Sequence, residues 1–130
     1  MSASSVLSSG KTSGQNPQLP MAQVFLLVDA PEALALIDMR VPRPSVVMAS
    51  FGALDHEILT QVNPDCIVLP LLHPGIDIEQ ALLVLAALGF GGCICALCPA
   101  LPNRRMVESE LRAFAPGLDV RLIELPEAAV

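Results

Sequence analysis

Four cysteines are the residues of this 130-residue chain whose type and spacing most suggest chemistry. They are Cys66 and a C-x-C-x-x-C run made of Cys93, Cys95 and Cys98. Thiolates at such spacing can bind zinc or an iron–sulfur cluster, or carry out thiol exchange. Cys93 and Cys95, however, fall within an expected buried strand and face one side of it, whereas Cys98 faces the other. We interpret the cysteines as core residues, because free cysteine packs as a small hydrophobe; a thiol-based metal or redox protein is the alternative.

Histidines and carboxylates form no second constellation of a catalytic type. His56 lies between two acids on the expected outer side of a helix, where a solvated side chain is the default. His73 lies in a loop that the fold would bring near Asp29, and a His–Asp contact there could respond to pH or touch a ligand. An ordinary loop residue is the simpler interpretation. No Ser/His/Asp grouping or glycine-rich nucleotide fingerprint stands out, so we expect no enzymatic activity, no bound metal and no cofactor.

Composition narrows the classes of partner. The net charge is -6 and only seven residues are basic, which argues against a nucleic-acid partner. No uncharged apolar segment reaches the roughly 18 residues of a membrane span, and no signal peptide is evident. We therefore expect a cytoplasmic protein without a membrane partner. Residues 1–20 are rich in Ser, Gly, Gln and Pro and predict a disordered leader before one folded domain, residues 21–130.

Short apolar runs alternate with amphipathic segments along the folded part. The expected strands are residues 24–28, 45–49, 66–69, 93–98 and 120–125. The expected helices are residues 31–39, 53–62 and 78–88, and a fourth that Asn103 caps and that buries Val107, Leu111 and Phe114. Pro70 marks the end of the central strand, because proline cannot donate to a ladder. This alternation predicts an α/β domain with a five-stranded parallel sheet in the flavodoxin-like order 2-1-3-4-5.

The chain leaves no room for a fifth helix after the last strand. We therefore expect part of one apolar sheet face to be bare within a single chain. A second copy of the chain in a homodimer, or a partner protein, would then cover it. On the central helix, Leu83 and Ala87 lie near the direction of Glu79 and Gln80 and are expected to be exposed, unless neighbouring loops cover them.

Five short segments in this order resemble the receiver domain of bacterial response regulators. They are Leu26-Leu27-Val28-Asp29, Pro64-Asp65-Cys66-Ile67-Val68-Leu69, His73-Pro74-Gly75-Ile76-Asp77, Ala87-Leu88-Gly89-Phe90-Gly91-Gly92 and Leu125-Pro126. The resemblance covers roughly residues 24–126. It implies a signalling domain whose family is phosphorylated on an aspartate at the end of the third strand, with Mg²⁺ held by acids after the first strand.

The residues that carry out this chemistry are almost all replaced. Asp29 keeps the first acid, but Ala30 replaces the second, and Pro70 occupies the place of the phosphoacceptor. Cys98 stands where the family has a hydroxyl residue, and Leu125 stands where it has a lysine. The chain therefore looks like a degenerate receiver, a pseudo-receiver that works without phosphorylation.

The resemblance also indicates where partners would bind. The family usually docks partner proteins on its fourth helix and fifth strand, so Arg104, Arg105 and Arg112 are expected to bind partners, and Leu83 on the central helix is a further candidate because of its expected exposure. Two other functions remain as alternatives: the thiol-based protein described above, and a sensor that binds a small ligand in the crevice at the carboxyl ends of the first and third strands.

Overall fold

Five parallel strands form one sheet; the structure, a computed structural model, describes residues 19–125. The strands are β2 (Val24–Val28), β3 (Ser45–Ala49), β4 (Cys66–Pro70), β5 (Cys93–Cys98) and β6 (Asp119–Glu124). Their order across the sheet is β3-β2-β4-β5-β6, and every neighbouring pair is parallel. This confirms the predicted flavodoxin-like order, in which β4 is the central strand.

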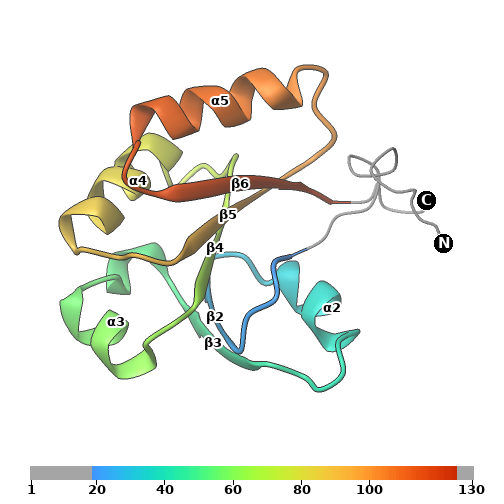
Figure 1. Ribbon diagram of the computed structural model, residues 1–130, viewed down its shortest axis with the longest axis vertical. Helices are drawn as coiled ribbons and strands as arrows, with labels where there is room; N and C mark the ends of the chain where they lie inside the picture. Colours follow the sequence, from blue (N-terminus) through green and yellow to red (C-terminus); the bar gives the residue numbers. More distant parts are fainter. Residues whose placement is uncertain (1–18, 126–130) are drawn as a thin grey trace, which may run out of the picture.

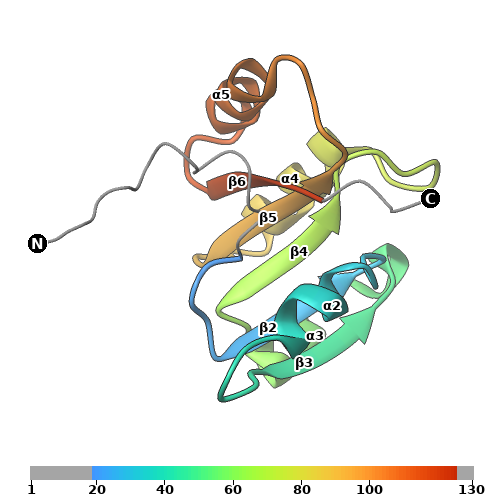
Figure 2. The same ribbon diagram turned by 90° about the vertical axis from the view of Figure 1, so that its right-hand side faces the viewer.

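Within the described residues, three helices pack on one face of the sheet and one helix packs on the other (Figure 1). The first group is α3 (His56–Val62), α4 (Ile78–Ala87) and α5 (Arg104–Phe114), and a short 3-10 turn, η2 (Phe51–Ala53), precedes α3. On the opposite face, α2 (Ala33–Asp38) lies in front of β2 in Figure 2. Within residues 19–125 no helix follows β6, as predicted. We call the two sides the three-helix face and the one-helix face.

Aspartates set the starts of two helices. The Asp77 carboxylate accepts the N–H of Glu79 at 3.0 Å and begins α4 where the sequence predicts it. The Asp55 carboxylate accepts the N–H of Ile58 at 2.9 Å, so α3 begins at His56 instead of the predicted residue 53. Asn103 does precede α5, but its side chain makes no capping hydrogen bond. Within the described residues, no helix is long and apolar enough to span a bilayer.

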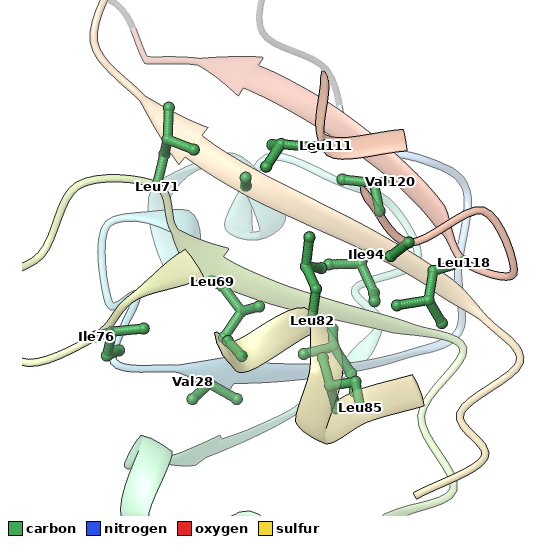
Figure 3. Close-up of a cluster of buried hydrophobic side chains, with 14 of the residues drawn as sticks. Val28, Leu69, Leu71, Ile76, Leu82, Leu85, Ile94, Leu111, Leu118 and Val120 are labelled. Atoms are coloured by element: carbon green, nitrogen blue, oxygen red, sulfur yellow. The ribbon is translucent and has the colours of Figure 1, made fainter. Parts of the chain in front are cut away.

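The core of the three-helix face is made of hydrocarbon side chains (Figure 3). Leu69, Ile94 and Val120 project from the strands toward Leu82 and Leu85 of α4. All five are 0% exposed. Burial of each such side chain contributes about 1.5–3 kcal/mol to stability, so this layer is the main source of cohesion in the fold.

The expectation of a bare sheet face is wrong. The apolar side chains Cys66, Val68, Cys95, Leu97 and Ile123 of the one-helix face are buried, whereas Cys93 is partly exposed and Arg121 is exposed. Leu19, only 4% exposed, belongs to the same apolar cluster. The Arg40 guanidinium holds this segment by donating to the backbone carbonyls of Leu19 and Pro20. Residues 1–18 of the expected leader lie outside the described residues, whereas Leu19 forms part of the folded core.

Candidate functional site

The receiver resemblance assigns five residues to a degenerate phosphorylation site, and all five lie at the carboxyl ends of strands: Asp29, Ala30, Pro70, Cys98 and Leu125. The first two follow β2, the next two close β4 and β5, and the last follows β6. Because parallel strands end at the same edge of a sheet, the fold brings all five to one edge. Leu27 pairs with Val68, two residues before Asp29 and Pro70 respectively, so these two lie level on neighbouring strands.

Asp29 uses its carboxylate to hold the following turn of the chain. Its Oδ2 accepts the N–H of Phe51 at 2.8 Å, at the start of η2. Its own N–H donates to the carbonyl of Ala49 at 2.9 Å. The backbone φ of Asp29 is 51°, a left-handed conformation that costs a residue with a side chain about 1–2 kcal/mol. The two hydrogen bonds offset that strain, so Asp29 has a structural use at this edge.

Pro70 and Cys98 make the same edge apolar. Pro70 is buried and pairs with Leu97 of β5. Cys98 is buried on the three-helix face, and its Sγ donates to the carbonyl of Ile123 at 3.8 Å. Burial and the charge of Glu124 raise the pKa of Cys98 to about 11, so the thiol keeps its proton at neutral pH. Neither residue offers the oxygen ligand that Mg²⁺ prefers.

His73 is engaged within its own loop. Its Nδ1 accepts the N–H of Gly75 at 3.0 Å, and its carbonyl accepts the N–H of Ile76 at 3.1 Å. Within residues 19–125 no hydrogen bond joins His73 to Asp29, which agrees with the interpretation of His73 as an ordinary loop residue. His56 is exposed, as expected for a solvated side chain.

Neither protein-family models nor curated proteins contain a match to this sequence. The receiver resemblance therefore stays a prediction. The order of the strands agrees with the predicted fold alone.

Three of the four cysteines meet on the one-helix face. Cys66 begins β4 and pairs with Cys93, which begins β5, and Cys95 follows on the same side of β5. Their sulfur atoms all lie within 4.8 Å of one another, and all three thiols are free. In the described part of the chain this is the sole group of three or more His, Cys, Asp or Glu side chains close enough to share an ion. Cys98 lies on the opposite face, so the four-cysteine alternative becomes a three-cysteine cluster.

The three thiols are not equivalent. Hydrogen bonds with Cys66 and Cys95, helped by the charge of Arg121, lower the pKa of Cys93 to about 4. The hydrogen bond with Cys66 also acts to lower the pKa of Cys95. The bond with Cys93, burial and the charge of Cys93 outweigh it and raise the pKa of Cys95 to about 12. For Cys66, the bonds with the other two cysteines and then burial raise the pKa well above its ordinary value. The partly exposed Cys93 therefore has the lowest pKa of the three thiols.

Arg121 is the member of this environment that sequence reasoning missed. It lies on the edge strand β6 and pairs with Cys95 of β5, on the same face of the sheet. Its guanidinium bonds to the Asp119 carboxylate at 3.1 Å. Arg121 also lines a cavity of about 1210 Å³, between residues 19–23 and residues 39–45. The alternation along β6 could have shown its face, but the strand register could not be read from the sequence.

A second surface feature is a shallow groove between α4 and α5, which we call the α4–α5 groove. Its lining residues are Asp77, Glu79, Gln80, Leu83, Val84, Ala87 and Phe114, around a volume of about 510 Å³. The predicted exposure of Leu83 and Ala87 is confirmed, and Leu83 is 55% exposed. The predicted burial of Phe114 is wrong, because it is 39% exposed. Phe114 is the last residue of α5, where the helix leaves the sheet, and its ring borders the groove instead.

Of the three arginines expected to bind partners, two donate hydrogen bonds to the backbone of β6 and the third is exposed. The Arg112 Nε donates to the carbonyl of Val120 at 2.9 Å, and Arg104 donates to that of Leu122 at 3.4 Å. The Glu108 carboxylate accepts the N–H of Leu122 at 2.8 Å. Side chains of α5 thus occupy the free backbone groups of β6, which protects this sheet edge from pairing with another strand. Arg105 is exposed and stays available for a partner.

Proposed function

We propose that this chain is a receiver-like signalling module of the cytoplasm that acts by protein–protein contact without aspartyl phosphorylation. The observation that carries the proposal is Pro70 at the place of the phosphoacceptor. Proline has neither a nucleophile nor a metal ligand. The flanking residues Leu69 and Leu71 are buried and apolar, so neither can substitute for it. The module would belong to a two-component pathway, as the resemblance implies.

The use of Asp29 also favours this proposal. In a phosphorylated receiver the acid after the first strand would be free to hold Mg²⁺. Here one carboxylate oxygen is hydrogen-bonded to the Phe51 N–H, and the neighbouring position is Ala30, which is buried and apolar. A divalent cation bound by Asp29 would find a partly engaged carboxylate with no acid at the next position, and one carboxylate binds such an ion weakly.

The partner is a protein that presents an amphipathic helix to the α4–α5 groove. Leu83 and Phe114 offer apolar contacts along the groove, and Asp77 and Glu79 add negative charge to its lining. A helix with apolar anchors and a basic rim complements both features. A second copy of this chain fits less well, because it is itself acidic, with a net charge of -6.

The phosphorylation half of the proposal is tested with a small-molecule phosphodonor. The full chain is incubated with acetyl phosphate and Mg²⁺ and its intact mass is measured. We expect no mass gain. A stoichiometric, acid-labile gain of one phosphoryl group, absent from the Asp29→Asn variant, would contradict the proposal.

The docking half is tested with charge substitutions in the groove. Leu83→Glu and Phe114→Glu should each weaken binding of a partner isolated from the native cell by roughly 30-fold, the effect of losing an interface hot spot. Met106→Glu is the matched control, because Met106 is 58% exposed on α5 and does not line the groove. Equal binding by all three variants, measured by calorimetry with the purified partner, would exclude the groove as the docking site.

A further inference from the structure

The three-cysteine cluster has the dimensions of a metal site. Cys66 Sγ lies 3.6 Å from Cys95 Sγ, and Cys93 Sγ lies 3.9 Å from Cys95 Sγ. Two thiolates that bind one zinc ion at about 2.3 Å in tetrahedral geometry stand about 3.8 Å apart. The observed spacing therefore lets an ion bind with little movement of the strands.

Rigid neighbours fix this arrangement. Cys66 and Cys93 are directly paired residues of adjacent strands, so their separation is set by the backbone hydrogen bonds of the sheet. Gly92 makes the pairing possible, because a Cβ atom at this position would lie 2.5 Å from the carbonyl oxygen of Asp65. That carbonyl accepts the N–H of Cys93 at 3.1 Å and starts the ladder between β4 and β5. The sulfur ligands are thus held by strands and need no loop to gather them.

The charge and the softness of the sulfur ligands determine which class of ion fits the cluster. Sulfur ligands prefer soft and borderline cations over magnesium or calcium. Three thiolates in a largely buried, apolar surrounding carry a charge that is costly to leave uncompensated. Arg121 supplies one positive charge, part of which its ion pair with Asp119 consumes. A divalent ion leaves less residual negative charge than a monovalent ion such as Cu(I), so the divalent class is favoured.

Access to the cluster is from the side of Cys93. Cys66 and Cys95 are fully buried at 0% exposure, whereas Cys93 is partly exposed. An ion that enters at Cys93 can exchange the thiol protons of the cysteines for metal–sulfur bonds, and those protons leave to solvent. Solvent on the same side supplies the fourth ligand that a tetrahedral ion requires.

We propose that Cys66, Cys93 and Cys95 bind one soft divalent cation of the zinc class on the one-helix face of the sheet. The site is independent of the α4–α5 groove, which lies on the opposite face. Bound metal would cross-link β4 and β5 at the amino-terminal ends of these strands and would stabilise the folded state.

The test uses the full chain, purified without oxygen, reduced, and freed of metal with a chelator. Cobalt(II) is titrated as a spectroscopic probe, and zinc stoichiometry is measured by native mass spectrometry. We expect a sulfur-to-cobalt charge-transfer band that saturates at one ion per chain, and one zinc ion retained. The absence of that band, or zinc binding without a fixed stoichiometry, would overturn the proposal.

Two cysteine variants locate the site. Cys93→Ser should weaken cobalt and zinc binding by roughly 100-fold or more, beyond the 10–100-fold that outer-shell changes cost. Cys98→Ser is the matched control and should bind as the parent does, because Cys98 lies on the other face. Unchanged binding by Cys93→Ser, or loss of binding by Cys98→Ser, would reject the assignment.

A second measurement guards against a folding defect in the variant. In the unaltered chain, one equivalent of zinc should protect Cys93 from iodoacetamide at least tenfold, as peptide mass spectrometry would show, while Cys98 stays unlabelled throughout. Equal alkylation of Cys93 with and without zinc contradicts the site. Leu83→Glu should leave metal binding unchanged, so failure of the docking proposal and failure of the metal proposal are distinguishable.

Discussion

The two faces of the sheet are built in different ways. On the three-helix face, α3, α4 and α5 cover a continuous layer of aliphatic side chains (Figure 3). On the one-helix face, α2 has six residues and leaves most of β4, β5 and β6 without a helix in front of them (Figure 2). That second face holds the three clustered thiols and Arg121. Cohesion is therefore concentrated on one side of the sheet, and reactive groups on the other.

This difference assigns separate tasks to the two sides. A hydrocarbon core gains stability from every buried methylene group and tolerates no polar group without a partner. A smaller layer that includes sulfur can hold an ion or a thiolate, because soft polarizable atoms pack as hydrophobes and still act as ligands. Substitutions on the two faces should therefore differ in what they change, stability on one and chemistry on the other.

The largest loss of stability is expected for Leu82→Ala on the three-helix face. Leu82 is 0% exposed and lies at the centre of that core, so the cavity should cost about 2–5 kcal/mol of unfolding free energy. Leu83→Ala, one residue further on the exposed side of α4, should change it by less than about 0.5 kcal/mol. Urea denaturation measures both values. Similar losses in the two variants would mean that the three-helix face is not the main core.

The next largest loss of stability is expected at Gly92, which directly precedes β5. Gly92→Ala forces a methyl group against the Asp65 carbonyl and should cost about 1–3 kcal/mol. It should also weaken cobalt binding, because Cys93 follows directly. Gly91→Ala is the control, since nothing lies within 4 Å of its added Cβ. If Gly92→Ala is as stable as Gly91→Ala, the close approach between β4 and β5 is relaxed in solution.

A smaller effect is expected for Arg40→Ala, which releases the segment at Leu19 and Pro20 from the one-helix face. The lost hydrogen bonds, and the loss of the guanidinium 5.7 Å from the centre of the Phe25 ring, should cost about 1–2 kcal/mol. Arg43→Ala removes an exposed ion pair with Asp38 and should cost less than about 1 kcal/mol. Thermal unfolding followed by circular dichroism ranks the two. A greater loss of stability for Arg43→Ala would contradict the claim that Arg40 anchors the segment at Leu19 and Pro20.

The smallest loss of stability is expected at the helix starts of the three-helix face, where α4 has a side-chain cap and α5 has none. Asp77→Ala removes a carboxylate that accepts the Glu79 N–H, so it should cost about 1 kcal/mol. Asn103→Ala should cost close to nothing, because the Asn103 side chain makes no capping bond to α5. The two unfolding free energies are compared in the same buffer. Equal losses would show that Asn103 caps α5 in solution.

The sequence by itself determined the sheet and its order. Runs of branched apolar residues marked the strands, and the bounds of β2, β3 and β5 were predicted to the residue because polar or turn residues flank each run. Asp77 predicted the start of α4 for a local reason, a carboxylate two residues from the N–H that it accepts. The alternation along β5 also placed Cys98 opposite Cys93 and Cys95.

Only the tertiary structure decided which residues meet across the elements. The register between β4 and β5 puts Cys66 beside Cys93, and the register between β5 and β6 puts Arg121 beside Cys95. The packing of α5 beside β6 leaves Phe114 exposed and lets Arg104 and Arg112 donate to carbonyls of β6. A local pattern records which side of its own element a residue occupies. The neighbour that it meets there depends on strand register and helix packing, which are set by contacts between residues distant in the chain.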